Sequence, residues 1–421
     1  MISFETARDK VIEVLTKRAD AAGAHALATE TIDLASEPSR ALGRILQQDI
    51  VADRNYPPFN RSVRDGFAVR AADAAEPGAR LKLIGESRAG VAFDGTVGAG
   101  ECVHIFTGAA VPRGANAVVM QEYTRADGDF IIIENAVRPG QHYVLAGAEA
   151  RVGEVMVGRG TRLSYAELAM AAEVGQAKLQ VTRKPRVAII STGDELVTLG
   201  EPVGHFQIRN SNSISLAAQV TLAEGEPIVL GKAPDDTERL RTQIEKALDS
   251  SDILVLSGGV SVGKYDLVEQ VLHDLGTEIF FDAVAIRPGK PAVFGMCRDK
   301  PVFGLPGNPV STMVTFELFV VPAIETLSGS RQPRHLPFFR ARLKHPVNEK
   351  GIVAHFLPAR ISLLDEKPEE PALPVVETLL WEGSGDIGAV VRGNCFLVVH
   401  ETRLTLEAGE WVDVMPRRGK F

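Results

Sequence analysis

Three glycine-rich segments of the sequence could bind an anion, since each follows a short apolar run that is typical of a buried strand. They span residues 191–195, 257–263 and 305–311. In an open α/β sheet, loops at the carboxyl ends of strands lead into helix N-termini, whose free N–H groups and dipole favour anions. Glycine lets the backbone approach a ligand, and small hydroxyls can bind phosphate or a metal-bound oxyanion. The predicted ligand-binding residues of these loops are Ser191, Thr192, Gly193, Ser257, Gly258, Gly259, Ser261, Gly263, Pro306, Gly307, Asn308, Pro309 and Ser311.

Two cations between the second and third loops form a candidate phosphate clamp. Arg287 and Lys290 bracket a Pro-Gly turn. A lone basic pair of this kind is usually a solvated turn. Beside three glycine-rich strand ends, Arg287 could bind an anion bidentately and Lys290 could add a compact charge. We therefore expect both side chains to help hold an anionic ligand.

The second loop also matches part of the phosphate loop of nucleotide hydrolases. The segment from Gly258 to Lys264 fits the pattern GxxxxGK, but Tyr265 stands where Ser or Thr would bind magnesium. The short pattern is weak by itself and its metal ligand is missing. A P-loop kinase or ATPase is therefore not the expected class.

Five carboxylates are candidates for chemistry, and for each of them the ordinary alternative is an exposed surface acid. Asp266 stands out because it falls three residues past Gly263, in the first turn of an expected helix. The alternative role at that position is an N-cap. The histidines show no HxxxH or HxxE grouping, so a zinc site is not expected. The five acids are Asp65, Asp194, Glu195, Asp235 and Asp266.

The composition describes a folded protein without a general basic face. The 421 residues include 54 acidic and 46 basic side chains, a formal net charge of −8. This balance argues against a binder of nucleic acid or acidic membrane, so an anionic ligand needs a local site. Only three cysteines occur, so no disulfide framework is expected, and Cys395 should be a buried strand residue rather than a nucleophile. No apolar run approaches the roughly 18–20 residues of a membrane helix, and we expect a cytosolic protein.

Hydrophobic periodicity divides the chain into four expected domains. Residues 1–47 and 149–182 should form one split helical domain, interrupted by an inserted β-rich domain over 48–148. Ser164 and Glu167 form a candidate capping box in the second half of the split domain. Strand–helix repeats over 183–330 predict an α/β domain with a mostly parallel sheet, and short alternating runs over 331–421 predict a C-terminal β domain.

Six segments in order, spread over some 250 residues, resemble the molybdopterin molybdenumtransferase family, to which bacterial MoeA and the E domain of gephyrin belong. Each segment is weak alone, and their order makes the resemblance specific. They are Tyr56-Pro57-Pro58-Phe59 with Asp65-Gly66-Phe67-Ala68-Val69-Arg70, Phe106-Thr107-Gly108-Ala109 with Val118-Val119-Met120-Gln121-Glu122, residues 191–196, residues 257–263 with Asp266, residues 287–291 and residues 305–311.

The resemblance implies a fold of multidomain α/β plus β class, in which a molybdopterin-binding α/β domain precedes a C-terminal β-barrel. It implies an elongated homodimer whose active site is shared between the α/β domain of one subunit and the inserted domain of the other. The implied reaction inserts molybdenum from molybdate into the dithiolene of adenylylated molybdopterin and releases AMP, with Mg²⁺ or a similar divalent ion. Molybdopterin adenylyltransferase and downstream molybdoenzymes are the implied protein partners.

The resemblance also assigns roles by motif position. Glu195 and Asp266 would place the metal ion. Arg287 and Lys290 would hold phosphate or molybdate, and the loops at Gly258 and Pro306 would cradle the ligand. The implied catalytic residues are Asp65, Thr107, Glu195, Asp235 and Asp266.

Several positions depart from the family pattern, and most of them make the inserted domain more cationic. Either an anionic ligand is held differently or the magnesium site is weakened. The alternative function is therefore a diverged molybdopterin-binding protein that stores, delivers or scaffolds without efficient insertion. Molybdate and tungstate share shape and charge, so the sequence accommodates either metal. The departures are Asn60, Arg61 and Arg64 before the active acid, Gly147-Ala148-Glu149 in place of Gly-Glu-Asp, Asn210 in place of an acid, and Ala283 in place of a basic residue.

Overall fold

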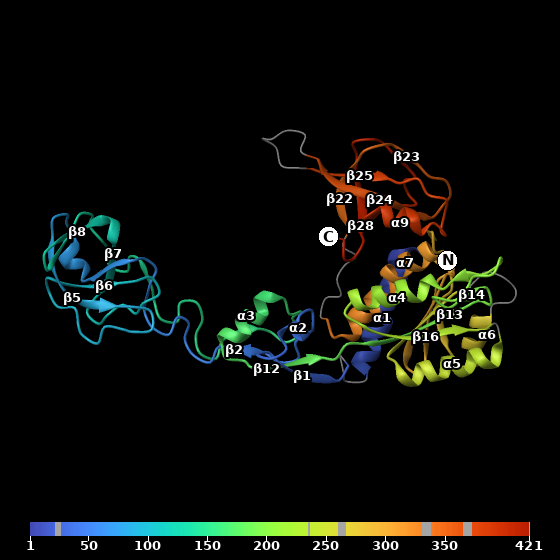
Figure 1. The fold of residues 1–421 in the computed structure, drawn as a ribbon, viewed down its shortest axis with the longest axis horizontal. Coiled ribbons are helices and arrows are strands. Elements are labelled where there is room, and N and C mark those ends of the chain that lie inside the picture. The colour runs from blue at the N-terminus through green and yellow to red at the C-terminus, as the bar shows by residue number, and fades with distance from the viewer. Residues whose placement is uncertain (22–26, 235, 260–266, 331–337, 365–372, 421) are drawn as a thin grey trace.

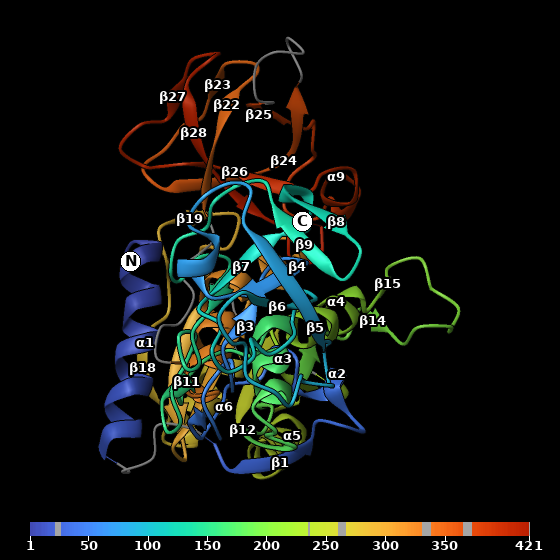
Figure 2. The ribbon, with the colours of Figure 1, turned by 90° about the vertical axis from the view of Figure 1, so that its left-hand side faces the viewer.

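A computed structural model describes residues 1–21, 27–234, 236–259, 267–330, 338–364 and 373–420. The molecule is elongated, with a small β-rich domain at one end and a larger body at the other (Figure 1). A narrow middle module joins the two, and the chain passes through this module twice. The larger body combines an α/β domain with a C-terminal β-barrel, which lies above the α/β domain in Figure 2.

The middle module is built from both sides of the insertion. Strand β1 (Thr29–Asp33) pairs antiparallel with β12 (Lys178–Thr182), and β2 (Ile50–Val51) pairs antiparallel with β11 (Val155–Val157). Helix α3 (Tyr165–Glu173) begins at the predicted capping box, which is confirmed with both of its hydrogen bonds present. Among the described residues of the first half of the module, the short α2 (Pro38–Ala41) is helical and 29–33 form a strand.

Helix α1 (Phe4–Ala21) packs on the α/β domain rather than on the middle module. The buried side chains Phe4 and Val11 belong to the same hydrophobic core as Phe319 and Ile324 of that domain. The sequence grouped this segment with the split module because periodicity shows that a helix has an apolar face without showing what covers it. Figure 2 shows α1 running along the side of the larger body.

The inserted domain contains a six-stranded sheet with an interior of small and branched apolar side chains. The strand order is β7-β4-β6-β5-β9-β8, and β3 (Arg61–Ser62) pairs with β10 (Tyr143–Val144) at its base. The six strands are β4 (Gly66–Val69), β5 (Arg80–Ser87), β6 (Glu101–Ile105), β7 (Ala117–Met120), β8 (Thr124–Asp127) and β9 (Phe130–Ile133), and two short 3₁₀ turns, η1 (Ala71–Ala74) and η2 (Gln121–Tyr123), follow β4 and β7.

The α/β domain holds a six-stranded sheet of order β16-β13-β17-β21-β20-β18, in which the first four strands are parallel. The predicted mostly parallel sheet is confirmed. Alternate residues of β13 face different cores: Ile189 packs in one and Ile190 in the other, so helices must cover both faces. The elements are β13 (Arg186–Thr192), β16 (Glu226–Ala233), β17 (Ile253–Ser257), β18 (Glu278–Phe281), β20 (Val293–Cys297), β21 (Lys300–Leu305), the pair β14 (Leu196–Val197) and β15 (Ile208–Arg209), and helices α4 (Ser211–Leu222), α5 (Thr237–Ser250) and α6 (Leu267–Asp274).

A long apolar helix crosses the core of this domain, as α7 (Pro309–Thr315), a π-helical turn η3 (Phe316–Val320) and α8 (Val321–Leu327). The whole span has the length and composition that could cross a membrane, and 78% of its most apolar window is buried inside the protein. Such burial is what the core helix of a folded domain shows. The sequence-based statement that no apolar run approaches this length was wrong for this helix, because its two acids, Glu317 and Glu325, hid the run.

The C-terminal domain is a closed barrel. Its strands pair in the order β24-β25-β22-β28-β26, and β26 pairs back with β24. Strand β19 (Ile286–Arg287) of the α/β domain also pairs with β24, so the predicted cationic clamp is braced by the barrel. The elements are β22 (Phe339–Leu343), β23 (Val347–Asn348), β24 (Ala354–Leu364), β25 (Leu373–Thr378), α9 (Ile387–Arg392), β26 (Cys395–Val399), β27 (Thr405–Leu406) and β28 (Trp411–Pro416).

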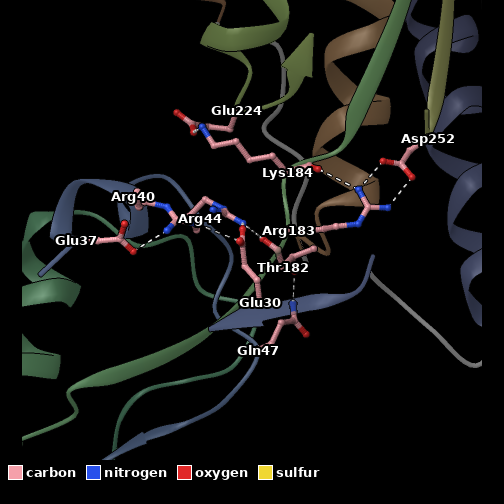
Figure 3. Close-up of polar contacts among 10 residues, drawn as sticks. All are labelled: Glu30, Glu37, Arg40, Arg44, Gln47, Thr182, Arg183, Lys184, Glu224 and Asp252. Carbon is pink, nitrogen blue, oxygen red and sulfur yellow. Dashed lines mark hydrogen bonds and ion pairs between the residues drawn. The ribbon is translucent and has the colours of Figure 1, made fainter. Parts of the chain in front are cut away.

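Ion pairs hold the middle module to the α/β domain where the chain passes from β12 into β13 (Figure 3). Arg183 donates two hydrogen bonds to Asp252, at 2.6 and 2.7 Å. The neighbouring Lys184 lies 2.9 Å from the Glu224 carboxylate. On the module side, Arg44 donates to Glu30 and to the carbonyl of Thr182. The short segment that joins β12 to β13 is therefore held by ion pairs and hydrogen bonds on its middle-module side and on its α/β-domain side.

Candidate functional site

The three glycine-rich loops meet at one edge of the parallel sheet, around a pocket of about 510 Å³. They follow the carboxyl ends of β13, β17 and β21, which are neighbouring strands. Anions and nucleotides bind at this place in open α/β sheets. The predicted residues that line the pocket are Ser191, Thr192, Gly193, Glu195, Ser257, Gly258, Gly259, Pro306, Gly307, Asn308 and Pro309, and the further lining residues are Leu196, Ile208, Arg209, Asn210, Ser211, Asn212 and Pro291.

Some predicted ligand residues do not line this pocket. Ser311 is buried in α7, with 4% of its surface exposed, and its carbonyl accepts a hydrogen bond from Thr315. Arg287 and Lys290 are exposed, and the pocket reaches only their neighbour Pro291. The cationic clamp is therefore not part of the pocket wall, although Lys290 directly precedes the lining residue Pro291. The predicted residues Ser261, Gly263, Asp266 and Asp235, and with them Lys264 and Tyr265, lie outside the described residues.

Close backbone packing between the loops requires glycine at Gly258. Its φ is +88°, and a Cβ there would lie 2.6 Å from the carbonyl oxygen of Thr192. The Gly258 N–H donates to the carbonyl of Leu305 at 3.1 Å, which joins the second loop to the third. Only a residue without a side chain can adopt this conformation in this space. The pocket floor is consequently made of backbone that a ligand can approach closely.

Asn212, in the first turn of α4, links the pocket loops through its side chain. Its Nδ2 donates to Ser257 Oγ and to the carbonyl of Gly307, both at 2.8 Å. Its Oδ1 is buried without a hydrogen-bond partner, as is Oγ1 of Thr192 in the first loop. An unpartnered buried polar atom costs about 1–3 kcal/mol. A ligand with a hydrogen-bond donor and an acceptor would satisfy both atoms.

The Glu195 carboxylate lies over the first loop, because a Cβ on Gly193 would be only 2.5 Å from its Oε2. It is exposed, and it makes no hydrogen bond or ion pair within the described part of the chain. The described residues contain no group of three His, Cys, Asp or Glu side chains that could hold a metal ion. Mg²⁺ keeps several waters and takes one or two carboxylates together with substrate phosphates. Glu195, which lines the same pocket as Thr192 and Asn212, could supply one such carboxylate.

Asp65 and Thr107 come together in the inserted domain, far along the molecule from the pocket (Figure 1). The Thr107 N–H donates to Asp65 Oδ1 at 2.7 Å. This backbone bond, together with the Thr107 hydroxyl and the nearby His104, lowers the pKa of Asp65 below its ordinary value. The acid is exposed and stays ionised at neutral pH. Of the predicted catalytic residues, Asp65 and Thr107 therefore lie in the inserted domain, and Glu195 lies in the α/β domain.

Four of the positions that depart from the family pattern have a structural role. Arg61 donates to Glu149 at 2.7 Å, so part of the added positive charge is paired within the inserted domain. Oδ1 of Asn60 accepts from the N–H of Ala146 at 3.0 Å. Asn210 is the N-cap of α4, where its side chain accepts from the Ser213 N–H, as an acid in that position would.

The sequence missed Arg209, Ser211 and Asn212 as pocket residues. A signal was present, because the run Asn210-Ser211-Asn212-Ser213 is rich in capping residues and precedes an apolar helical pattern. It predicts a helix N-terminus, which is a good place to look for ligand contacts.

The fold and the pocket define a multidomain α/β protein that binds a polar ligand at the carboxyl edge of its parallel sheet. Family models match nearly the whole chain: "MoeA N-terminal region (domain I and II)" over residues 2–175, "Probable molybdopterin binding domain" over 188–326 and "MoeA C-terminal region (domain IV)" over 340–416. The pocket lies within the second match. The chain belongs to the molybdopterin molybdenumtransferase family.

Relatives of known name match at least three quarters of both chains. The molybdopterin molybdenumtransferase of Haemophilus influenzae is 32% identical over 421 residues, which is 99% of this chain and 98% of that protein. The Nostoc protein of the same name is 38% identical over 344 residues, 80% and 78% of the two chains. Among solved structures, the molybdopterin biosynthesis moeA protein of Pyrococcus horikoshii is 29% identical, with a TM-score of 0.80 over 99% of this chain and 100% of that one.

Proposed function

We propose that this protein is a molybdenum insertase, which transfers molybdenum from molybdate into adenylylated molybdopterin and releases AMP. The observation that carries the proposal is the pocket, because its three glycine-rich loops and two unsatisfied buried polar atoms lie in the part of the chain that matches a molybdopterin-binding domain. A transferase function also agrees with the names of the full-length relatives.

The described residues supply binding, orientation and charge. The loop backbones and the side chains of Thr192 and Asn212 would hold the polar parts of the ligand and orient it. Such positioning converts a reaction between two bound groups into an effectively intramolecular one. Glu195 would hold Mg²⁺, which would neutralise phosphate charge when it is bound. Arg287 and Lys290 would attract the anionic substrates.

We also propose that the working molecule is a homodimer. Asp65 and Thr107 lie in the inserted domain, which is at the opposite end of the molecule from the α/β domain that contains Glu195 (Figure 1). A second copy, placed so that its inserted domain reaches the pocket, would complete each site with Asp65 of the partner subunit. A closed twofold arrangement would form two equivalent sites in this way.

The test of the insertase is AMP release from adenylylated molybdopterin, with molybdate and magnesium present. We expect molybdate-dependent release of one AMP for each molybdopterin, and strong reduction in Glu195→Gln. Tight binding of adenylylated molybdopterin without AMP release would contradict the insertase and favour a storage or delivery protein.

The test of the dimer is complementation between two inactive variants, Asp65→Asn and Glu195→Gln. A mixture that exchanges subunits should recover about a quarter of wild-type activity, because half of the dimers are mixed and each mixed dimer has one intact site. If each site lay within one chain, the mixture would stay inactive.

A further inference from the structure

Lys232, at the end of β16, hydrogen-bonds to the backbone on both sides of Glu195. Its ammonium donates to the carbonyl of Asp194 at 2.9 Å and to the carbonyl of Leu196 at 3.0 Å. An ammonium has three donors and no acceptor, so it can hold both carbonyls at once. Lys232 does not line the pocket. It can therefore act on the site only through this loop.

A β-bulge directs Lys232 towards the loop. In the β13–β16 pairing, Ile189 is opposite Val229 and Ser191 is opposite Lys232, so β16 contains one additional residue between these positions. Gly231 has a φ of +82°, and no atom lies within 4 Å of where its Cβ would be. Glycine is thus required by the conformation and not by lack of space. Bulges of this kind turn a side chain to a new direction.

The remaining carbonyls of the loop are held by backbone donors. The carbonyl of Glu195 accepts from the Ile208 N–H at 2.9 Å, and that of Val197 accepts from the Asn210 N–H at 3.1 Å. Four successive carbonyls, from Asp194 to Val197, therefore have partners. Two of the four accept a hydrogen bond from one side chain, that of Lys232.

We infer that Lys232 is a positioning residue for Glu195. By fixing the backbone on either side of Glu195, it keeps the carboxylate over Gly193 at the pocket wall, where it can meet magnesium and the substrate phosphate. This inference rests on the proposed function, because the proposed insertase reaction requires the Glu195 carboxylate at that position. Without the ammonium, two carbonyls lose a donor and the loop gains freedom, so that Glu195 spends less time in the binding position.

The test compares Lys232→Met, which keeps most of the length of the side chain but removes the ammonium, with Lys232→Arg and with Lys246→Met. Lys246 is exposed on α5 and forms the matched control. Amide hydrogen exchange of the protein without ligands reports the freedom of the loop. Lys232→Met should speed exchange at Leu196, Ile208 and Asn210 by at least roughly tenfold, as expected for losing the two hydrogen bonds that the ammonium donates. Lys246→Met should match wild type.

The second readout is the magnesium concentration that gives half-maximal AMP release. Lys232→Met should raise it roughly tenfold, with melting temperature unchanged, and Lys232→Arg should recover most of the loss. Unchanged exchange and unchanged magnesium dependence would overturn the inference, and so would faster exchange spread over the whole sheet. Wild-type protein that releases no AMP would instead overturn the proposed function, while the exchange data would still decide whether Lys232 holds the loop.

Discussion

The side chain of Asn212 shows how much of the pocket depends on single residues. It joins two loops that follow different strands. Its removal would leave Ser257 Oγ and the Gly307 carbonyl without this donor, which costs free energy of folding. Asn212→Ala should lower the free energy of unfolding by about 1–3 kcal/mol, measured by urea unfolding, and should weaken binding of adenylylated molybdopterin. Asn308→Ala is the control, because Asn308 lines the same pocket and its side chain makes no capping bond. Equal destabilisation by both changes would contradict the role of Asn212.

Burial makes the cysteines unreactive. The three cysteines are buried, and burial raises the pKa of the Cys102 and Cys395 thiols to about 12. The thiolate is the nucleophile, so a thiol reagent such as dithionitrobenzoate should label the native protein very slowly at pH 8. Guanidinium-unfolded protein should show three reactive thiols. Rapid labelling of native protein would contradict the structural role predicted for Cys395.

At the scale of residues, the sequence predicted types of contact better than pairs of partners. The glycine loops could be found, because their local patterns carry the signal, whereas Asp65 and Thr107 were named as site residues only through the family resemblance. The bond from Asn212 to Gly307 and that from Lys232 to Asp194 could not be found, since each joins residues far apart in sequence. Such pairs depend on the strand order, which local patterns leave open.

At the scale of elements, the pocket depends on how closely its loops pack. Gly258→Ala would place a Cβ 2.6 Å from the Thr192 carbonyl oxygen, at a φ of +88°. We expect a loss of about 1–3 kcal/mol in the free energy of unfolding, from backbone strain and displacement of the first loop. The measurement is urea unfolding followed by circular dichroism.

Gly307→Ala is the matched control for that change. A Cβ on Gly307 would have as its nearest neighbour the Cα of Gly258, at 3.6 Å, which is an ordinary contact, and its φ is not positive. Its free energy of unfolding should fall by less than about 1 kcal/mol. If Gly307→Ala destabilised as much as Gly258→Ala, the conformational argument at Gly258 would be wrong.

Helices and strands with a clear local sequence pattern were predicted. Strands whose pairing partner lies far away in the sequence were not. The capping box at Ser164 and the parallel strands that end in glycine loops are confirmed. The strand β1 within an expected helical segment was missed, because its partner β12 lies some 150 residues later. A barrel was implied only by family resemblance, since alternating strands do not reveal that β26 pairs back with β24.

At the scale of the whole molecule, the middle module acts as an arm that carries Asp65 away from its own pocket. In the proposed homodimer, the orientation of this arm would decide where the inserted domain reaches the second copy. The Arg183–Asp252 pair lies at the base of the arm, beside the linker that enters β13 (Figure 3). It is partly buried, so it is screened less by salt than a surface pair. Its strength should therefore depend more on pH than on ionic strength.

The charge of Asp252 has a definite effect on stability. Burial raises the pKa of its carboxyl, but hydrogen bonds from the Arg183 guanidinium and the Arg186 N–H outweigh it, so the pKa in the folded protein is lowered. A carboxyl with a lowered folded pKa stabilises the fold above its unfolded pKa, about 3.9 for Asp. This contribution is lost as the pH falls through the folded pKa.

Asp252→Asn removes this charge and leaves a similar shape. At pH 7 the variant should be less stable than wild type by about 1–3 kcal/mol, the worth of hydrogen bonds between charged groups. The difference should stay constant from about pH 8 to about pH 5 and shrink below about pH 4, measured by urea unfolding at each pH. Asp249→Asn, at an exposed acid of α5 in a loose pair with Arg298, should change stability by less than about 0.5 kcal/mol at every pH. A difference for Asp252→Asn that is as large near pH 2.5 as at pH 7 would show that the ionised carboxylate does not hold the base of the arm.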